Sequence, residues 1–177
     1  MILTEENYYS PEANKEYLSV SQYKDFCGTI GRLACEEQAM AKLEGKWEQE
    51  RTVSLMVGSY VDSYFEGTLH DFKEKNPEIF TKSGKLKSEY QKAEEIIDRI
   101  KRDTLFMWFM SGEKQRIFTS EMFGGKWKVK LDSYLPGKMI VDLKIMNSLR
   151  EAHYTKDYGI MDFISYWGYD IQAAVYQ

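Results

Sequence analysis

The sequence predicts a mixed α/β domain in which several helices precede three antiparallel strands and a last helix. Over about residues 52–75 and 90–109, apolar residues recur every three to five positions, which is the spacing of amphipathic helices. Between about 117 and 146 the alternation changes to every second residue, which is typical of strands. The helical spacing returns over 164–177. Helices before and after a group of antiparallel strands indicate a mixed α and β class.

The length of the chain indicates how many domains to expect. With 177 residues, of which 43% are hydrophobic and 15% aromatic, the chain can bury one substantial core. We expect an irregular arm over residues 1–18 and one domain over residues 19–177. No apolar run reaches the roughly 20 residues that cross a bilayer, and no basic segment followed by an apolar one opens the sequence. These features predict a cytoplasmic protein without a membrane segment.

The first half of the chain is predicted to be helical. Ser19 can cap a helix over 19–26, and after two glycines a second helix is expected over about 32–43. One long amphipathic helix is expected over 52–75, ending at the Asn-Pro pair that follows it. A further helix over about 90–109 precedes the change to strand alternation.

Three strands are predicted in the second half, over residues 117–122, 126–134 and 138–146. Gly124-Gly125 suits a tight turn between the first two strands, and Pro136-Gly137 suits a second turn. Short turns join antiparallel neighbours, so all three strands are expected to be antiparallel. The last predicted helix then extends to the final residue.

Composition argues against two classes of protein. A net charge of -4 is unsuited to coating nucleic acid through a general positive field, so contacts to nucleic acid would have to come from locally placed basic residues. Two cysteines, Cys27 and Cys35, are too few for a disulfide framework or a four-thiolate metal site. We expect both to be reduced, half-buried thiols on helices.

An aspartate and a lysine share one face of the third predicted strand. Strand alternation places Asp142 and Lys144 side by side and turns Leu143 to the opposite face. An isolated pair of this kind is usually an exposed ion pair that contributes little to stability. A second aspartate, Asp132, lies on the preceding strand, and two carboxylates that converge beside a lysine can bind a divalent cation and activate a water molecule. The three residues together therefore indicate a candidate metal site.

The loop between these two strands decides whether the two aspartates converge. A loop with an even number of residues would pair Asp132 with Val141 and turn Asp132 and Asp142 to opposite faces of the sheet. A loop with an odd number of residues, or a bulge near Pro136-Gly137, would bring them together. The metal-site hypothesis therefore requires an odd loop or a bulge.

Several motifs follow one another along the chain in a fixed order. In chain order they are Gly58-x-x-x-Asp62-x-x-x-Glu66, Asp132, Asp142-x-Lys144 and Gln172-x-x-x-Tyr176, together with the opening Ser19-x-Ser21-x-x-x-x-Phe26. This order resembles the PD-(D/E)xK nuclease superfamily, and within it the RecE-like and RecB-like exonucleases of the phage type. The resemblance covers about residues 19–177. Each motif is weak by itself, and the specificity comes from their order.

The resemblance implies a role for each residue of the strand cluster. Asp132 and Asp142 would bind one or two Mg²⁺ or Mn²⁺ ions, with the carbonyl oxygen of Leu143 as a further ligand. Lys144 would orient the attacking water and stabilise developing negative charge. Together with a helix carboxylate, these residues form the predicted catalytic site.

The helix ligand is left open between two residues. RecB-like relatives have histidine where this chain has Asp62, and Glu66 lies one helical turn further on the same face. We prefer Glu66 as the metal ligand and catalytic residue, with Asp62 as an alternate ligand or a supporting group.

The predicted DNA contacts come from two places in the sequence. The resemblance implies that Gln172 and Tyr176 bind a DNA phosphate or support the catalytic lysine, although a polar helix face would have the same pattern. Lys126, Lys128 and Lys130 share one strand face and could contact the DNA backbone. Lysines on an edge strand also prevent aggregation, and we hold the two interpretations equal.

The resemblance also implies a restriction-endonuclease-like core. This core has a central mixed β-sheet, here with three antiparallel strands, flanked by helices, and it includes a final strand after the second core helix. The sequence ends at Gln177 with that helix, so the final core strand is expected to be missing. We expect a C-terminally truncated domain, or one that another subunit completes.

The function that the resemblance implies is metal-dependent exonuclease digestion of linear duplex DNA in phage or prophage recombination. Such enzymes commonly form homo-oligomeric rings and work with a single-strand annealing protein. An endonuclease or nickase with the same site is an alternative enzyme. A non-catalytic DNA-binding module of the same fold is an alternative from another class.

Overall fold

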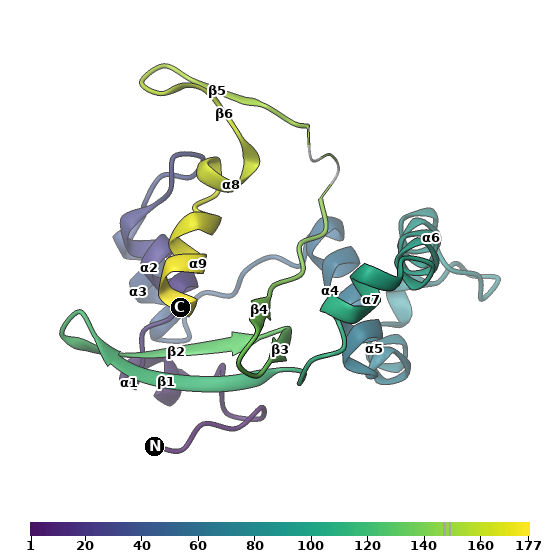
Figure 1. Cartoon of the computed structure of the whole chain (residues 1–177), viewed down its shortest axis with the longest axis horizontal. Helices are drawn as coiled ribbons and strands as arrows, with labels where there is room; N and C mark the ends of the chain where they lie inside the picture. Colours follow the sequence, from purple (N-terminus) through teal and green to yellow (C-terminus); the bar gives the residue numbers. More distant parts are fainter. Residues whose placement is uncertain (147, 149) are drawn as a thin grey trace. The chain divides into compact units, whose positions relative to one another are not determined.

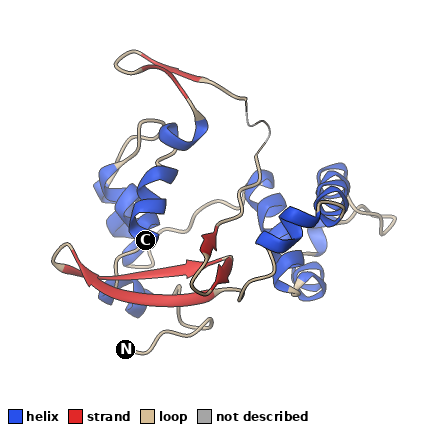
Figure 2. Ribbon diagram, viewed as in Figure 1, coloured by secondary structure: helices blue, strands red, loops and turns tan. Residues whose placement is uncertain are grey.

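The computed structural model describes residues 1–146, 148 and 150–177. It divides into two compact units, each treated below by itself. The first unit comprises residues 1–49, 117–130 and 146–177, and the second unit comprises residues 50–116 and 131–145. Helices and short strands occur in both units, as Figure 2 shows, so the predicted mixed class is confirmed.

Helices make up most of the second unit (Figure 1). In chain order they are α4 (Val53–Glu66), α5 (Leu69–Lys75), the 3₁₀ helix η1 (Pro77–Ile79), α6 (Ser88–Lys101) and α7 (Thr104–Phe109). Helices α4 and α6 pack along each other, and their buried residues Tyr60, Val61, Ala93 and Ile97 belong to one hydrophobic core. This core fixes the helix that carries Asp62.

The single helix predicted over 52–75 is two helices in the structure. Gly67 ends α4 with a left-handed backbone (φ 81°), which glycine adopts without steric strain, and its N–H donates to the carbonyl oxygen of Ser63. The prediction was wrong because the apolar spacing continues across the break. Leu69 and Phe72 of α5 pack on the same core as Phe65 of α4.

The helix predicted over 90–109 is also interrupted. Helix α6 ends at Lys101, and Asp103 begins α7 because its side chain accepts a hydrogen bond from the backbone N–H of Phe106 at 3.0 Å. An aspartate at a helix N-terminus satisfies a backbone donor that the helix itself leaves unpaired. The aromatic residues at the end of the predicted helix therefore belong to a separate short helix.

Strands β3 (Ser133–Leu135) and β4 (Met139–Val141) form an antiparallel hairpin in the second unit. Ser133 pairs with Val141 and Leu135 with Met139, which leaves three residues, Pro136 to Lys138, in the loop. The N–H of Lys138 donates to the carbonyl oxygen of Leu135 at 3.0 Å, and Gly137 has φ 69°. Proline followed by a glycine with positive φ is typical of a type II turn.

The predicted strands 126–134 and 138–146 differ from those in the structure. The first is divided at Asp132 into β2 (Gly125–Leu131) and β3, and the second keeps only β4. Within the described residues, β2 pairs with β1 (Arg116–Met122), and β3 pairs with β4 in a separate two-stranded sheet. The three strands therefore do not form one continuous sheet, and the division falls at Asp132, whose Oδ2 accepts a hydrogen bond from the backbone N–H of Leu143.

The N-terminal part of the first unit is helical. Its helices are α1 (Pro11–Glu16), α2 (Val20–Cys27) and α3 (Glu36–Leu43). Ser19 caps α2 as predicted, and Gln22 completes a capping box with it. The predicted irregular arm over 1–18 contains α1, which Ser10 caps. Cys27 and Cys35 are free thiols as expected, but both are exposed.

The C-terminal part of the first unit contains a hairpin that the sequence analysis missed. Strands β5 (His153–Thr155) and β6 (Gly159–Met161) pair antiparallel, and helices α8 (Phe163–Tyr166) and α9 (Tyr169–Tyr176) follow. The single helix predicted over 164–177 is broken at Gly168, which has φ 64°. Helix α9 contacts α2 (Figure 1). None of the helices that the structure describes is both long and apolar enough to span a membrane.

Candidate metal-binding and catalytic site

Helix α4 supplies two carboxylates to the second unit. Asp62 and Glu66 lie one turn apart, and both side chains are half-buried. Tyr60 and Val61, which precede Asp62, are fully buried, so the core fixes the helix beneath these acids. Glu66 is the last residue of α4, and its Oε1 accepts a hydrogen bond from Nε2 of Gln115 at 2.6 Å.

Asp132 is attached to the segment that follows β4. Its Oδ2 accepts a hydrogen bond from the backbone N–H of Leu143 at 2.7 Å. The register of the hairpin, continued by one pair beyond Ser133 and Val141, places Asp132 opposite Asp142. The three-residue loop thus meets the odd-loop condition derived from the sequence, and the two aspartates are not turned to opposite faces.

Asp142 and Lys144 follow β4 and lie outside the ladder. The ammonium group of Lys144 forms an ion pair with Oδ2 of Asp142, and their side chains are 34% and 27% exposed, respectively. Leu143 between them is buried and packs in the core. The predicted alternation is therefore retained, although this segment is irregular in the structure.

A small cavity in the second unit joins these groups. It is narrow and partly open to solvent. Its polar walls come from Asp62, Glu66, Gln115 and Asp132, and its apolar walls from Phe65, Met110 and Leu143. The structure thus brings the two helix carboxylates and Asp132 to one cavity, beside the segment that carries Asp142 and Lys144.

Burial and like charges disfavour ionisation of the acids at this cavity. The pKa of Asp62 is raised to about 7, mainly by burial and in smaller part by the neighbouring carboxylates of Asp132 and Glu66. Burial also raises the pKa of Asp132, against the lowering effect of the Leu143 N–H and with a contribution from Asp142. Without a cation, the surroundings of the cavity therefore do not fully stabilise the ionised carboxylates of Asp62 and Asp132.

The raised pKa of Asp62 predicts how the stability of the fold depends on pH. The folded-state pKa of Asp62, about 7, lies above its ordinary value of 3.8, so the folded protein holds the proton more tightly than the unfolded chain. The contribution of the Asp62 carboxyl to the free energy of unfolding is therefore fully present below about pH 4. It is lost as the pH rises to about 7, and the loss amounts to up to about 4 kcal/mol. An Asp62→Asn variant in EDTA should lack this loss and be more stable than the wild type at pH 8. Chemical denaturation at pH 4.5, 6 and 8 measures the difference.

The matched control for this prediction is Asp71→Asn on α5, because Asp71 is exposed in the same unit. This control should follow the wild-type stability at each pH. Equal pH slopes for Asp62→Asn and the wild type would contradict the prediction.

The donor atoms at the cavity fit a hard divalent cation. Among the described residues, no three His, Cys, Asp or Glu side chains already form a ligand set for a metal ion. Mg²⁺ does not require one, because it keeps several waters and usually takes one or two protein carboxylates. Oδ1 of Asp62 is buried and has no hydrogen-bond partner in the described part of the chain. Such an atom is unfavourable unless something binds it, and a cation at the cavity would do so.

Comparison with known proteins agrees with this geometry. Residues 19–177 match the family described as a PDDEXK-like domain of unknown function (DUF3799). The chain belongs to this family. The PD-(D/E)xK superfamily expected from the motifs is thus confirmed, and the odd hairpin loop and the acidic cavity are features of a PDDEXK-like domain in this chain.

One solved structure is closely similar to this PDDEXK-like domain. It is the crystal structure of a candidate exonuclease from Eubacterium rectale, which is 62% identical in sequence and superimposes with a TM-score of 0.97. The match covers 100% of the present chain and 66% of that chain, so the present chain spans less than two thirds of that protein. No curated protein matches the chain.

Two polar residues at or near this cavity were missed in the sequence. Gln115 lines the cavity, and the ammonium of Lys114 donates to the carbonyl oxygen of Met110 and lies close enough to Asp132 to interact electrostatically. Both residues lie in the irregular segment between α7 and β1, where no periodicity assigns a direction to a side chain. The local sequence signal is Gly112, which follows the helix predicted over 90–109.

The predicted basic strand face belongs to the first unit, and one of its lysines is misassigned. Lys128 is 1% exposed, and its ammonium donates to the backbone oxygen of Tyr8 and to Oδ1 of Asn14. Burial lowers its pKa to about 8. Lys128 is therefore an internal residue in this structure, and the expectation of an exposed lysine at this position is wrong.

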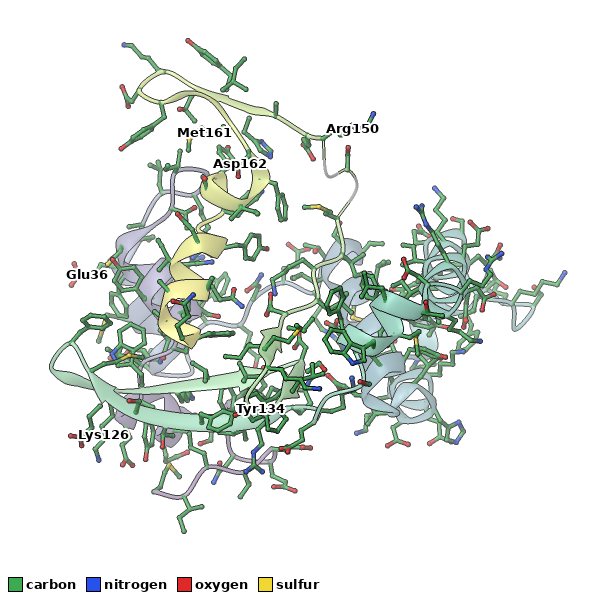
Figure 3. All side chains as sticks on the ribbon, viewed as in Figure 1. Glu36, Lys126, Tyr134, Arg150, Met161 and Asp162 are labelled. Carbon is green, nitrogen blue, oxygen red and sulfur yellow. The ribbon has the colours of Figure 1, made fainter. Side chains whose placement is uncertain are left out.

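The other lysines of that face remain accessible. Lys126, labelled in Figure 3, is exposed and forms an ion pair with Glu16 at 3.1 Å, and Lys130 lies 4.8 Å from the ring centre of Tyr9. Gln172 and Tyr176 lie one turn apart on α9, also in the first unit, and both are half-buried. The assignment of these residues to DNA remains a prediction.

Proposed function

We propose that the chain is the catalytic domain of a divalent-metal-dependent exonuclease that hydrolyses phosphodiester bonds of linear duplex DNA. The observation that carries the proposal is the register of the β3–β4 hairpin. Continued by one pair, this register sets Asp142 opposite Asp132, and Asp132 lines a cavity together with Asp62 and Glu66. Membership of a PDDEXK-like family and similarity to a candidate exonuclease support the same chemistry.

The proposed division of roles follows from the contacts of each group. Asp132 and Asp142, with the carbonyl oxygen of Leu143, would hold Mg²⁺ or Mn²⁺, and Glu66 would be the helix ligand, with Asp62 as an alternate ligand beside it. The bound ion would polarise the phosphate and lower the pKa of a water molecule. Lys144 would orient the attacking water and stabilise negative charge on the phosphate, because its ammonium already lies beside Asp142.

DNA contacts outside this cavity are proposed for the first unit. Lys126 and Lys130 would contact backbone phosphates, and Gln172 and Tyr176 would bind a phosphate or support the catalytic lysine. Lys128 is left out of this set because it is buried. The wider setting that we propose is a RecE-like role in cytoplasmic phage or prophage recombination, with a homo-oligomeric ring and a single-strand annealing protein as partners.

Digestion of matched linear and circular duplex DNA tests the proposed function. We expect the protein to degrade linear duplex with Mg²⁺, to leave covalently closed circles intact, and to stop when EDTA is added. An Asp142→Ala variant should be inactive on both substrates. Cutting of circles would support the endonuclease or nickase instead. Absence of any metal-dependent cutting, while DNA is still bound, would support the non-catalytic module.

A further inference from the structure

Glu66 lies at a position that electrostatics disfavours. It is the last residue of α4, and the negative end of the helix dipole lies at that terminus. Its carboxylate also lines a cavity that already contains Asp62 and Asp132. A glutamate in this place is destabilising unless a hydrogen-bond donor or a cation compensates for its charge.

Gln115 supplies such a donor. Its Nε2 donates to Oε1 of Glu66 at 2.6 Å, across 49 positions of sequence. Thr68 adds a longer contact of 3.4 Å to the other carboxylate oxygen. A neutral amide can fix the direction of a carboxylate without neutralising it, whereas arginine or lysine in the same place would compete with a cation for the charge.

The backbone of Gln115 is strained, and its surroundings hold it. Its φ is 50°, and among the described residues the only other non-glycine residue with positive φ is Phe123, in the turn between β1 and β2. Non-glycine residues in this region are uncommon and persist where neighbouring structure over-determines them. Two backbone hydrogen bonds, at 2.8 and 2.9 Å, attach Glu113 to Tyr134, which is labelled in Figure 3.

Gly112 permits this close attachment. A Cβ atom at position 112 would lie 2.5 Å from the carbonyl oxygen of Tyr134, which is too close for any side chain. The N–H of Gly112 instead donates to Oγ of Ser133 at 3.0 Å. The segment that carries Gln115 is thus fixed to β3, next to Asp132, and this attachment sets the direction of the Gln115 side chain.

We propose that Gln115 is a positioning residue that fixes the Glu66 carboxylate for binding of a divalent cation at this cavity. The proposal rests on the metal-dependent function proposed above and adds a residue to that site. Hydrogen bonds from neighbouring residues commonly orient the carboxylates that bind metal ions, and loss of one typically weakens metal affinity about 10–100-fold. The strained backbone of Gln115 and the unfavourable position of Glu66 would then both serve to hold one carboxylate ready for a cation.

Mn²⁺ titration of the full chain without DNA tests the proposal by calorimetry. Gln115→Met keeps the length of the side chain and removes the donor, so it should weaken Mn²⁺ binding about 10–100-fold. Gln115→Gly also removes the amide but relieves the backbone strain, so it should weaken Mn²⁺ binding equally and lose less thermal stability than Gln115→Met. In nuclease assays, Gln115→Met should need more Mg²⁺ for half-maximal rate and should recover most of its rate at saturating Mg²⁺.

The matched control is Gln91→Met, because the Gln91 side chain also donates a single hydrogen bond, to the carbonyl oxygen of Leu86 at 2.7 Å, in the same unit. This control should bind Mn²⁺ like the wild type. Wild-type affinity in Gln115→Met, or no Mn²⁺ binding by the wild type, would overturn the inference. Mn²⁺ binding by the wild type without DNA hydrolysis would instead overturn the proposed function and leave the role of Gln115 standing if the variants bind more weakly.

Discussion

Replacing Asp132 with asparagine is expected to lower metal-dependent DNA hydrolysis by about 10³-fold or more while the protein remains folded. Asparagine keeps the shape of the side chain and an oxygen that can accept the Leu143 N–H, which now binds the carboxylate at 2.7 Å. Only the negative charge is lost. Since a metal-bound phosphate derives several kcal/mol of transition-state stabilisation from its cation, weaker cation binding should reduce the rate strongly.

Stability and Mn²⁺ binding separate this effect from unfolding. Burial raises the pKa of Asp132, so removal of its charge should leave the metal-free protein at least as stable as the wild type at pH 8. Mn²⁺ affinity should fall together with activity. The matched control is Asp103→Asn, because Asp103 also accepts a backbone N–H, at 3.0 Å, and asparagine caps a helix equally well. Near-normal digestion by Asp132→Asn would exclude Asp132 as a metal ligand.

The part of the site that sequence reasoning predicted well depends on local rules. By strand alternation, Asp132 and Asp142 can come together only if the loop between their strands has an odd number of residues or contains a bulge. The structure has a three-residue loop with Gly137 at positive φ. Pro136-Gly137 was the signal for a wider turn, because a proline followed by glycine suits a type II turn.

Tertiary contacts account for the parts that sequence reasoning missed. The break at Gly67 was not predicted because α4 and α5 both place their apolar residues on the same core. The spacing of apolar residues indicates which residues face the core, but it does not show whether the helix is continuous. Gln115 lies 49 positions from Glu66 in sequence, and its orientation toward Glu66 depends on the attachment of its segment to β3. Lys128 was misassigned because its partners, Tyr8 and Asn14, come from the N-terminal segment, which the sequence analysis expected to be irregular.

The β5–β6 hairpin was missed for a different reason. Its paired residues Tyr154 and Ile160 are 76% and 78% exposed, and no residue of either strand is fully buried, so the hairpin lacks the buried apolar face of a strand that covers a core. Turn residues alone did not distinguish it from a loop. Exposed strands are therefore less predictable from sequence than strands that cover a core.

Substitution of Lys144 and substitution of Asp132 should impair DNA hydrolysis for different reasons, and this difference tests the proposed roles most directly. The ammonium of Lys144 lies against Oδ2 of Asp142, a carboxylate that the proposal assigns to the cation. Lys144→Met removes a positive charge that competes with the cation for this carboxylate. We therefore expect Mn²⁺ to bind Lys144→Met at least as tightly as it binds the wild type, in contrast to Asp132→Asn.

The rate of DNA hydrolysis by Lys144→Met should nevertheless fall on the order of 10²–10³-fold at saturating Mg²⁺, because a group that stabilises developing charge acts on the chemical step and not on metal affinity. Lys138→Met is the matched control, since Lys138 lies in the loop of the same hairpin, 5.9 Å from the ring centre of Trp108. This control should keep its rate. If Lys144→Met lost Mn²⁺ affinity in parallel with its rate, the lysine would be a structural support of the cluster, and the water-orienting role would have to be assigned elsewhere. Tight Mn²⁺ binding with slow hydrolysis would place Lys144 in the chemistry itself.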